Sequence, residues 1–127
     1  MKKSQITLSD TQLSIMRVLW AHGEADTQTV CDALASRTHK PAYTTVATLL
    51  KRLEKRGLVA HTAQDRKLIY SPLVSEQEVR TSMVAQMVGS LFKGDSAALL
   101  SHLIREREIG ANDLETLMQM IDKEAKP

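Results

Sequence analysis

The sequence predicts a mainly helical protein with one small β-hairpin, divided into an N-terminal domain (residues 1–73) and a C-terminal helical domain (residues 74–127). Two observations support this fold class. Three short helical patterns in the first domain are followed directly by two strand-like runs, and the last third of the chain shows helical spacing of its apolar residues throughout. A chain of 127 residues can bury one full core, or two small ones if a second chain shares the burial.

Two short helices are expected first. Ser9 begins the pattern Ser-Asp-Thr-Gln, a capping box, and the apolar spacing that follows predicts a helix to about Ala21. A second helix is expected to be capped by Asp26 or Thr27 and to end near Arg37.

A third, amphipathic helix is expected between Pro41 and Gly57, with Gly57 supplying a left-handed C-terminal cap. Its apolar stripe has the spacing i, i+3, i+4 and i+7: Val46, Leu49, Leu50 and Leu53. The opposite face and its flank carry hydroxyls and then cations: Thr44, Thr45, Thr48, Lys51, Arg52 and Lys55. A helix that reads a DNA major groove needs short polar groups for base edges and cations for phosphates. Taken alone, the pattern also fits a basic face that is simply solvated.

A β-hairpin is expected directly after the third helix. Residues 58–62 and 67–73 are strand-like, and the polar residues 63–66 form a loop of hairpin length between them. Helices followed by such a hairpin form a winged helix-turn-helix. Arg66 and Lys67, at the tip of this wing, are placed to reach a phosphate or the adjacent minor groove, although an ordinary solvated turn would also carry such residues.

The last third predicts three helices, with a capping box at Ser75, a break before a cap at Asp95, and a final helix after Gly110. These helices expose more apolar surface than they can bury among themselves. A two-fold dimer that interleaves them would bury it. The residues expected at this interface are Met83, Met87, Leu91, Leu99, Leu103, Leu114, Leu117, Met118 and Ile121.

The charge of the chain is unevenly distributed. Residues 1–73 hold 11 Lys or Arg and 6 Asp or Glu, a net charge of +5, whereas residues 74–127 hold 6 and 9, a net charge of −3. A basic first half favours contact with a polyanion in that half. Only four aromatic residues are present, which disfavours stacking on single-stranded bases. The expected partner is double-stranded DNA, because the third helix has the pattern of a major-groove reader.

The composition is that of a folded, soluble protein, with 43% hydrophobic and 25% charged residues. The single cysteine, Cys31, excludes an internal disulfide bond and suits a reducing compartment. No apolar run approaches the roughly 18 residues that span a bilayer, and the first residues lack the apolar core of a secretory signal. We therefore expect a cytoplasmic protein without membrane insertion.

Other function classes have less support. No nucleophile–base pair, carboxylate pair or metal cluster occurs at a motif spacing, so we expect no enzyme, no cofactor and no metal site. Cys31 is unfavourably spaced from His22 and His39 for a soft-metal site, and a lone cysteine is more often packed and inert. Two alternatives stay open: a winged-helix module for protein–protein contact in a larger assembly, and a regulator that senses a small ligand between its domains.

Short matches spread over nearly the whole chain point to one family. They are Leu13, Met16 and Leu19-Trp20, then Ala42-Tyr-Thr-Thr-Val46, Thr48-Leu-Leu-Lys-Arg-Leu53 and Lys55-Arg-Gly-Leu58, and finally Ile69-Tyr70, Leu91-Phe92 and Gly94-Asp95. In this order and at these spacings, the sequence resembles the penicillinase-repressor family, which also includes the methicillin-resistance and copper-responsive repressors. The resemblance implies a dimeric winged-helix repressor that binds a dyad-symmetric operator through its first domain.

Carried over by position, the resemblance also implies individual contacts. Base or backbone contacts are implied for Ala42, Thr44, Thr45 and Thr48, phosphate contacts for Arg52, and wing contacts near Arg66. Ala42 and Ala47 stand where well-studied relatives have longer polar side chains, so the preferred operator is expected to differ.

The resemblance leaves the inducing signal open. Penicillinase-type members are inactivated by cleavage of an Asn-Phe bond in the helix after the Gly-Asp pair, and this implies an upstream membrane sensor-protease. The matching positions here are His102 and Leu103, which departs from that pattern. The paired Cys-x-Cys motifs of copper-responsive members do not occur in this sequence. We expect His102 to be a surface or interface histidine.

Overall fold

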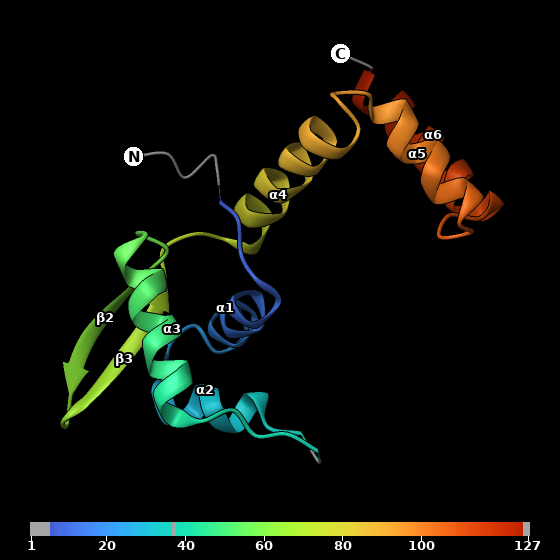
Figure 1. Cartoon of the computed structure of the whole chain (residues 1–127). Coiled ribbons are helices and arrows are strands. Elements are labelled where there is room, and N and C mark those ends of the chain that lie inside the picture. The colour runs from blue at the N-terminus through green and yellow to red at the C-terminus, as the bar shows by residue number, and fades with distance from the viewer. Residues whose placement is uncertain (1–5, 37, 126–127) are drawn as a thin grey trace. The chain divides into compact units, whose positions relative to one another are not determined.

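The computed structural model describes residues 6–36 and 38–125, and its helices and strands are shown in Figure 1. The described chain is mainly helical with one small antiparallel sheet, which confirms the predicted fold class. It divides into two compact units, Met1–Met83 (unit 1) and Val84–Pro127 (unit 2).

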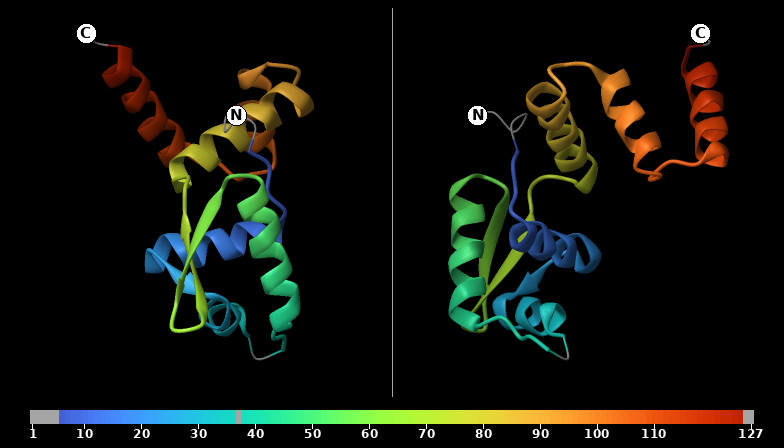
Figure 2. Two further views of the ribbon diagram at one scale, coloured as in Figure 1. Left: turned by 90° about the vertical axis from the view of Figure 1, so that its left-hand side faces the viewer. Right: turned by 45° about the vertical axis from the view of Figure 1, so that its right-hand side comes forward.

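Unit 1 is a winged helix-turn-helix. Its elements are α1 (Asp10–His22), β1 (Ala25–Asp26), α2 (Thr27–Leu34), α3 (Tyr43–Lys55), β2 (Val59–Gln64), β3 (Lys67–Pro72) and the first turns of α4 (Glu76–Leu91). Strands β2 and β3 form the predicted hairpin, called the wing below, and both views in Figure 2 show α3 beside it. Strand β1 was not predicted, because two residues are too short to show an alternating pattern.

The predicted ends of the first three helices are close to the observed ones. Ser9 and Gln12 form the expected reciprocal capping box, and Asp26 is the N-cap of α2. The predicted end of α2 was too late, because α2 ends at Leu34 and Arg37 lies outside the described residues. Gly57 follows α3 with a φ of 80°, the left-handed conformation expected there.

The core of unit 1 lies behind α3. Val46, Leu50 and Leu53 are completely buried, as their predicted stripe requires, whereas Leu49 is only partly buried. Tyr70 of β3 packs into the same core from the wing. Burial of the stripe fixes which face of α3 is left for solvent or a ligand.

The first turns of α4 are part of unit 1. Val79 is 2% exposed in the core, and Ser82 Oγ accepts a hydrogen bond of 2.8 Å from the backbone N–H of Ile6. Trp20 Nε1 on α1 donates a hydrogen bond of 2.8 Å to the carbonyl oxygen of Val74, which lies just before α4 in the chain. The domain boundary between residues 73 and 74 stays a prediction.

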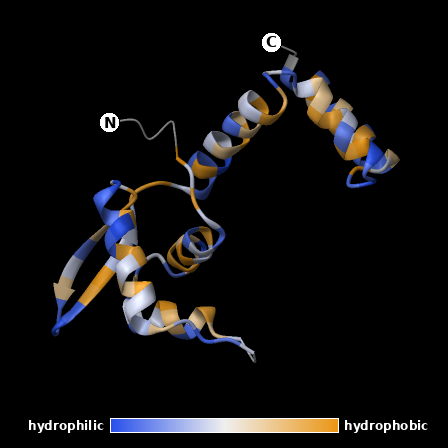
Figure 3. Cartoon of the chain, in the orientation of Figure 1, coloured by the Kyte–Doolittle hydropathy of each residue, from blue (hydrophilic) through white to orange (hydrophobic). Residues whose placement is uncertain are grey.

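Unit 2 holds the rest of α4, with α5 (Ser96–Arg105) and α6 (Ala111–Ala125). Asp95 caps α5 as predicted, accepting a hydrogen bond of 3.1 Å from the N–H of Ala98. Apolar residues run along both α5 and α6 (Figure 3), but no described residue of these helices is buried. Within the described ranges, no helix is both long and apolar enough to cross a membrane.

Candidate nucleic-acid interface

The outer face of α3 gathers most of the residues predicted to contact DNA. Thr44, Thr45, Thr48 and Arg52 are exposed and line one shallow surface pocket of about 310 Å³, together with Leu49. Ala42, just before the helix, is the N-cap and makes no side-chain cap hydrogen bond. Three hydroxyls from the first turns of α3 and the guanidinium of Arg52 from its last turn thus line one surface, together with Leu49.

Lys51 lies on a different side of α3 from Arg52. It lines a cleft of about 440 Å³ formed by the start of α2, α3 and the wing. The lining residues are Asp26, Thr27, Gln28, Tyr43, Ala47, Lys51, Arg66, Lys67, Leu68 and Tyr70. The structure therefore separates four of the five predicted cations: Arg52 lies beside the threonines, and Lys51, Arg66 and Lys67 line this wing cleft. Lys55 is exposed on the last turn of α3.

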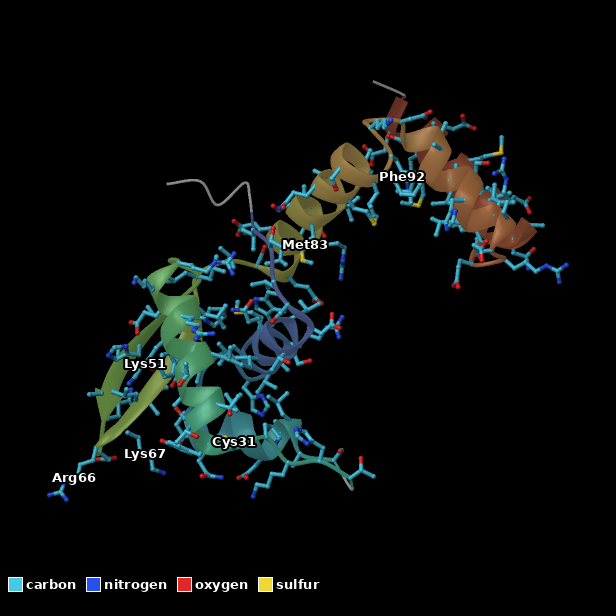
Figure 4. All side chains as sticks on the ribbon, in the orientation of Figure 1. Cys31, Lys51, Arg66, Lys67, Met83 and Phe92 are labelled. Atoms are coloured by element: carbon cyan, nitrogen blue, oxygen red, sulfur yellow. The ribbon has the colours of Figure 1, made fainter. Side chains whose placement is uncertain are left out.

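The wing ends in a two-residue turn rather than the predicted four-residue loop. Gln64 pairs with Lys67, so only Asp65 and Arg66 lie between the two strands. Both turn residues have positive φ, 50° and 66°, which is the geometry of a type I′ hairpin turn. Figure 4 shows Arg66 extending beyond the tip of the hairpin.

Arg66→Gly is expected to stabilise unit 1 and to weaken DNA binding. A left-handed φ is strained for arginine and free for glycine, so the free energy of unfolding should rise by about 1 kcal/mol, measured by urea denaturation. Binding to duplex DNA should weaken because a tip cation is lost. Arg56→Gly is the matched control, since Arg56 has a φ of −83° and its replacement should destabilise. A loss of stability in Arg66→Gly would contradict the strain argument.

Two polar side-chain contacts connect the wing with other elements of unit 1. Lys67 Nζ lies 3.6 Å from Asp26 Oδ2, and His61 Nδ1 on β2 lies 2.7 Å from Glu54 Oε2 on α3. Hydrogen bonds from Thr29, with Lys67 beside the carboxylate, lower the pKa of Asp26. The ring of His61 is also 5.5 Å from that of Tyr70 between ring centroids.

Buried ionisable groups offer no sign of reactivity. Burial raises the pKa of the Cys31 thiol, so it is protonated at neutral pH. Burial, and secondarily the carboxylate of Glu54, raise the pKa of Tyr70. Among the described residues, no group of three His, Cys, Asp or Glu side chains is placed to hold a metal ion.

The residues predicted at a dimer interface fall into two sets. Met83 packs against the core of unit 1, so part of its surface is already covered. The others lie in unit 2, where α5 and α6 form an open, almost wholly apolar groove of about 710 Å³. The groove is lined by Ser96, Leu99, Leu100, Leu103, Leu117, Met120, Ile121 and Glu124.

The remaining predicted residues of unit 2 lie outside this groove lining. Leu91 and Met118 are mostly exposed, and Met87 and Leu114 are half-buried. His102 is exposed on α5, 6.1 Å from the ring of Phe92 between ring centroids. His102 and Leu103, which match the position of the family's cleavage site but depart from its Asn-Phe pattern, lie within α5.

Several residues of the wing cleft were missed by the sequence prediction. Tyr43 and Leu68 are exposed at 53% and 39%, and Gln28 lies at the start of α2. Asp26 was recognised only as a helix cap. The missing signal is the pairing of β1 with β3, which brings the start of α2 beside the wing.

Comparisons with known proteins agree with this arrangement. A family model described as "Penicillinase repressor" matches residues 8–123. The chain is 33% identical over 116 residues to "Transcriptional regulator BlaI" of Mycobacterium tuberculosis, covering 90% of this chain and 82% of that protein. It is 23% identical over 116 residues to the penicillinase repressor of Bacillus licheniformis, covering 91% and 90%. The solved DNA binding domain of the repressor BlaI is similar with a TM-score of 0.50 and 33% identity, over 57% of this chain and 87% of that one.

Proposed function

The chain belongs to the penicillinase-repressor family of DNA-binding transcriptional repressors, and from this premise we propose that it acts as a homodimer that binds a palindromic operator through α3. The observation that carries the proposal is the division of α3 into two faces. One face is completely buried in the core at Leu50 and Leu53, and the other presents exposed threonines and cations. Such a helix can enter a major groove without uncovering any core residue.

In this proposal the threonines and the cations of α3 and the wing contact different parts of the DNA. Thr44, Thr45 and Thr48 supply contacts to base edges or the backbone, beside Ala42. Phosphates are contacted by Lys51, Arg52, Lys55 and Arg66, whereas Lys67, the fifth cation of this face, is paired with Asp26. Each phosphate contact steepens the dependence of log affinity on log salt by about 0.9. A protein that binds an operator must have access to the chromosome, so the proposal includes a cytoplasmic location. It includes no catalytic step.

The apolar groove of unit 2 supports the dimer. Leu103 and Leu117 line it, and Ile121 is 65% exposed at its edge. A contiguous apolar surface of this kind marks an interaction site in a soluble protein. A second copy of the chain carries the same groove, and a two-fold axis would bury both against each other.

Selection of bound sequences from random double-stranded DNA at physiological salt tests the proposal. Recovery of a palindrome is the expected result, because two copies of α3 related by a two-fold axis read two half-sites. Weak, salt-sensitive retention without a motif would indicate a non-specific binder. A protein that retains no DNA would instead favour the protein-interaction module, and both outcomes would overturn the proposal.

Thr45→Ala and Lys51→Ala should separate sequence reading from phosphate contact. Thr45→Ala should weaken operator binding by about 1–3 kcal/mol and leave binding to unrelated duplexes nearly unchanged. Lys51→Ala should weaken binding to both duplexes and flatten the log–log salt dependence by about 0.9. Affinities of both variants for operator and unrelated duplexes, measured by fluorescence anisotropy over a salt series, test this division of roles. If both variants lost only non-specific affinity, α3 would not be the reading helix.

A further inference from the structure

The wing cleft combines three cations with one carboxylate. Lys51, Arg66 and Lys67 line it, and among its described lining residues Asp26 carries the single negative charge. On a surface that approaches DNA, a carboxylate repels phosphates and cancels one of the cations beside it. This placement is not required for capping, because asparagine caps a helix as well as aspartate does.

We infer that Asp26 competes with DNA phosphates for Lys67, and that it thereby lowers the affinity of the protein for every duplex by one phosphate contact. The inference rests on the proposed function, since it concerns the same DNA-binding face. Lys67 Nζ lies 3.6 Å from Asp26 Oδ2, while the Lys67 side chain is 66% exposed and free to turn outward. Of the five cations predicted from the sequence to contact DNA, all among the described residues, Lys67 alone has a carboxylate partner.

Asp26 itself is held firmly in place. Its side chain is 13% exposed, and its Oδ1 accepts a hydrogen bond of 2.9 Å from the backbone N–H of Thr29. Pairing of Asp26 with Ile69 across β1 and β3 fixes its backbone against the wing. When Lys67 moves to a phosphate, the carboxylate stays behind, without its cation and close to the DNA. Both changes oppose binding, so Lys67 remains with Asp26 in the complex of the wild-type protein.

The sequence of the DNA does not enter this competition. A phosphate contact carries no base information, so the affinity for operator and for unrelated duplexes falls by the same factor. The ratio of operator affinity to non-specific affinity is therefore unchanged, and Asp26 sets the absolute affinity for DNA rather than the specificity.

Asp26→Asn tests the inference with the full chain. It keeps the cap and the shape of the side chain but releases Lys67. Affinity for operator and for unrelated duplex should rise by the same factor, about three- to tenfold at physiological salt, and the salt dependence should steepen by about 0.9. Asp32→Asn is the matched control: it adds the same charge on α2 and breaks a comparable pair with Lys40 at 3.8 Å, but Asp32 does not line the cleft.

Lys67→Gln supplies the second measurement. In the wild-type background it should leave the salt dependence unchanged, because Lys67 contacts no phosphate there. In the Asp26→Asn background it should remove the whole gain, which a double-mutant cycle quantifies. Should Asp26→Asn fail to fold, as judged by thermal melting, Asp26→Ser, which also caps a helix and removes the carboxylate, takes its place in both measurements.

Three results would overturn the inference. The first is an Asp26→Asn protein that binds no better than Asp32→Asn, and the second is one that binds more weakly, which would make Asp26 a residue that orients the wing for DNA. The third is a flatter salt dependence for Lys67→Gln alone. Failure of the proposed function looks different, because the wild-type protein itself would then show no salt-sensitive binding to duplex DNA.

Discussion

Leu117→Asp is expected to turn the protein into a monomer and to weaken operator binding about a hundredfold or more. Leu117 lines the apolar groove between α5 and α6, and a carboxylate there cannot be buried against a second chain without a large desolvation penalty. A monomer binds one half-site at a time, so the affinity gained when a dimer binds both half-sites together is lost. Light scattering gives the mass, and anisotropy gives the affinity for a full operator and for a half-site.

The half-site measurement makes this result specific to dimerisation. Affinity of Leu117→Asp for a single half-site should stay within about twofold of the wild type, because unit 1 is unchanged. Gln119→Asp is the control, since Gln119 is exposed on the same helix and does not line the groove. It should remain a dimer and bind the full operator normally. An intact dimer in Leu117→Asp would exclude the groove as the interface.

Leu50→Ala should lower the free energy of unfolding of unit 1 by about 2–5 kcal/mol, as large-to-small changes in a close-packed core do. Leu50 is 0% exposed, so the change leaves a cavity behind α3. Marginally stable domains have only about 5–15 kcal/mol in total, so a substantial part of the stability would be lost. Denaturant titration followed by circular dichroism measures the effect.

Thr48→Ala, on the opposite face of the same helix, should weaken operator binding and leave stability almost unchanged. Thr48 is exposed in the polar pocket of α3, so its loss should change stability by less than about 0.5 kcal/mol while operator affinity falls. Leu50→Ala, studied at a temperature where it is folded, should bind the operator within about threefold of the wild type. If Thr48→Ala unfolded unit 1 instead, the assignment of the two faces would be wrong.

Local patterns were sufficient to predict much of unit 1. The stripe of α3, the capping boxes at Ser9 and Ser75, and the hairpin all depend on residues a few positions apart, whose spacing is visible in the sequence. The threonine face of α3 followed from the same spacing, because a helix that buries Leu50 must expose Thr48.

The rest depends on contacts between distant segments. The wing cleft exists because β1 pairs with β3, and a two-residue strand has no periodicity to reveal it. Lys51 and Arg52 are adjacent in the sequence but point into different surroundings, which only the position of the wing decides. Met83 packs against the core of unit 1, a contact that its helical spacing does not show, and its place at a dimer interface stays a prediction.

The hydrogen bond from Trp20 to Val74 gives the molecule an optical reporter. Trp20 is the single tryptophan of the sequence, and its indole is half-buried where the chain leaves the wing for α4. Its fluorescence therefore reports the hydration of this junction in unit 1, whereas circular dichroism records every helix of both units. A denaturation followed by both signals reveals directly whether the two units unfold as one cooperative block or in succession.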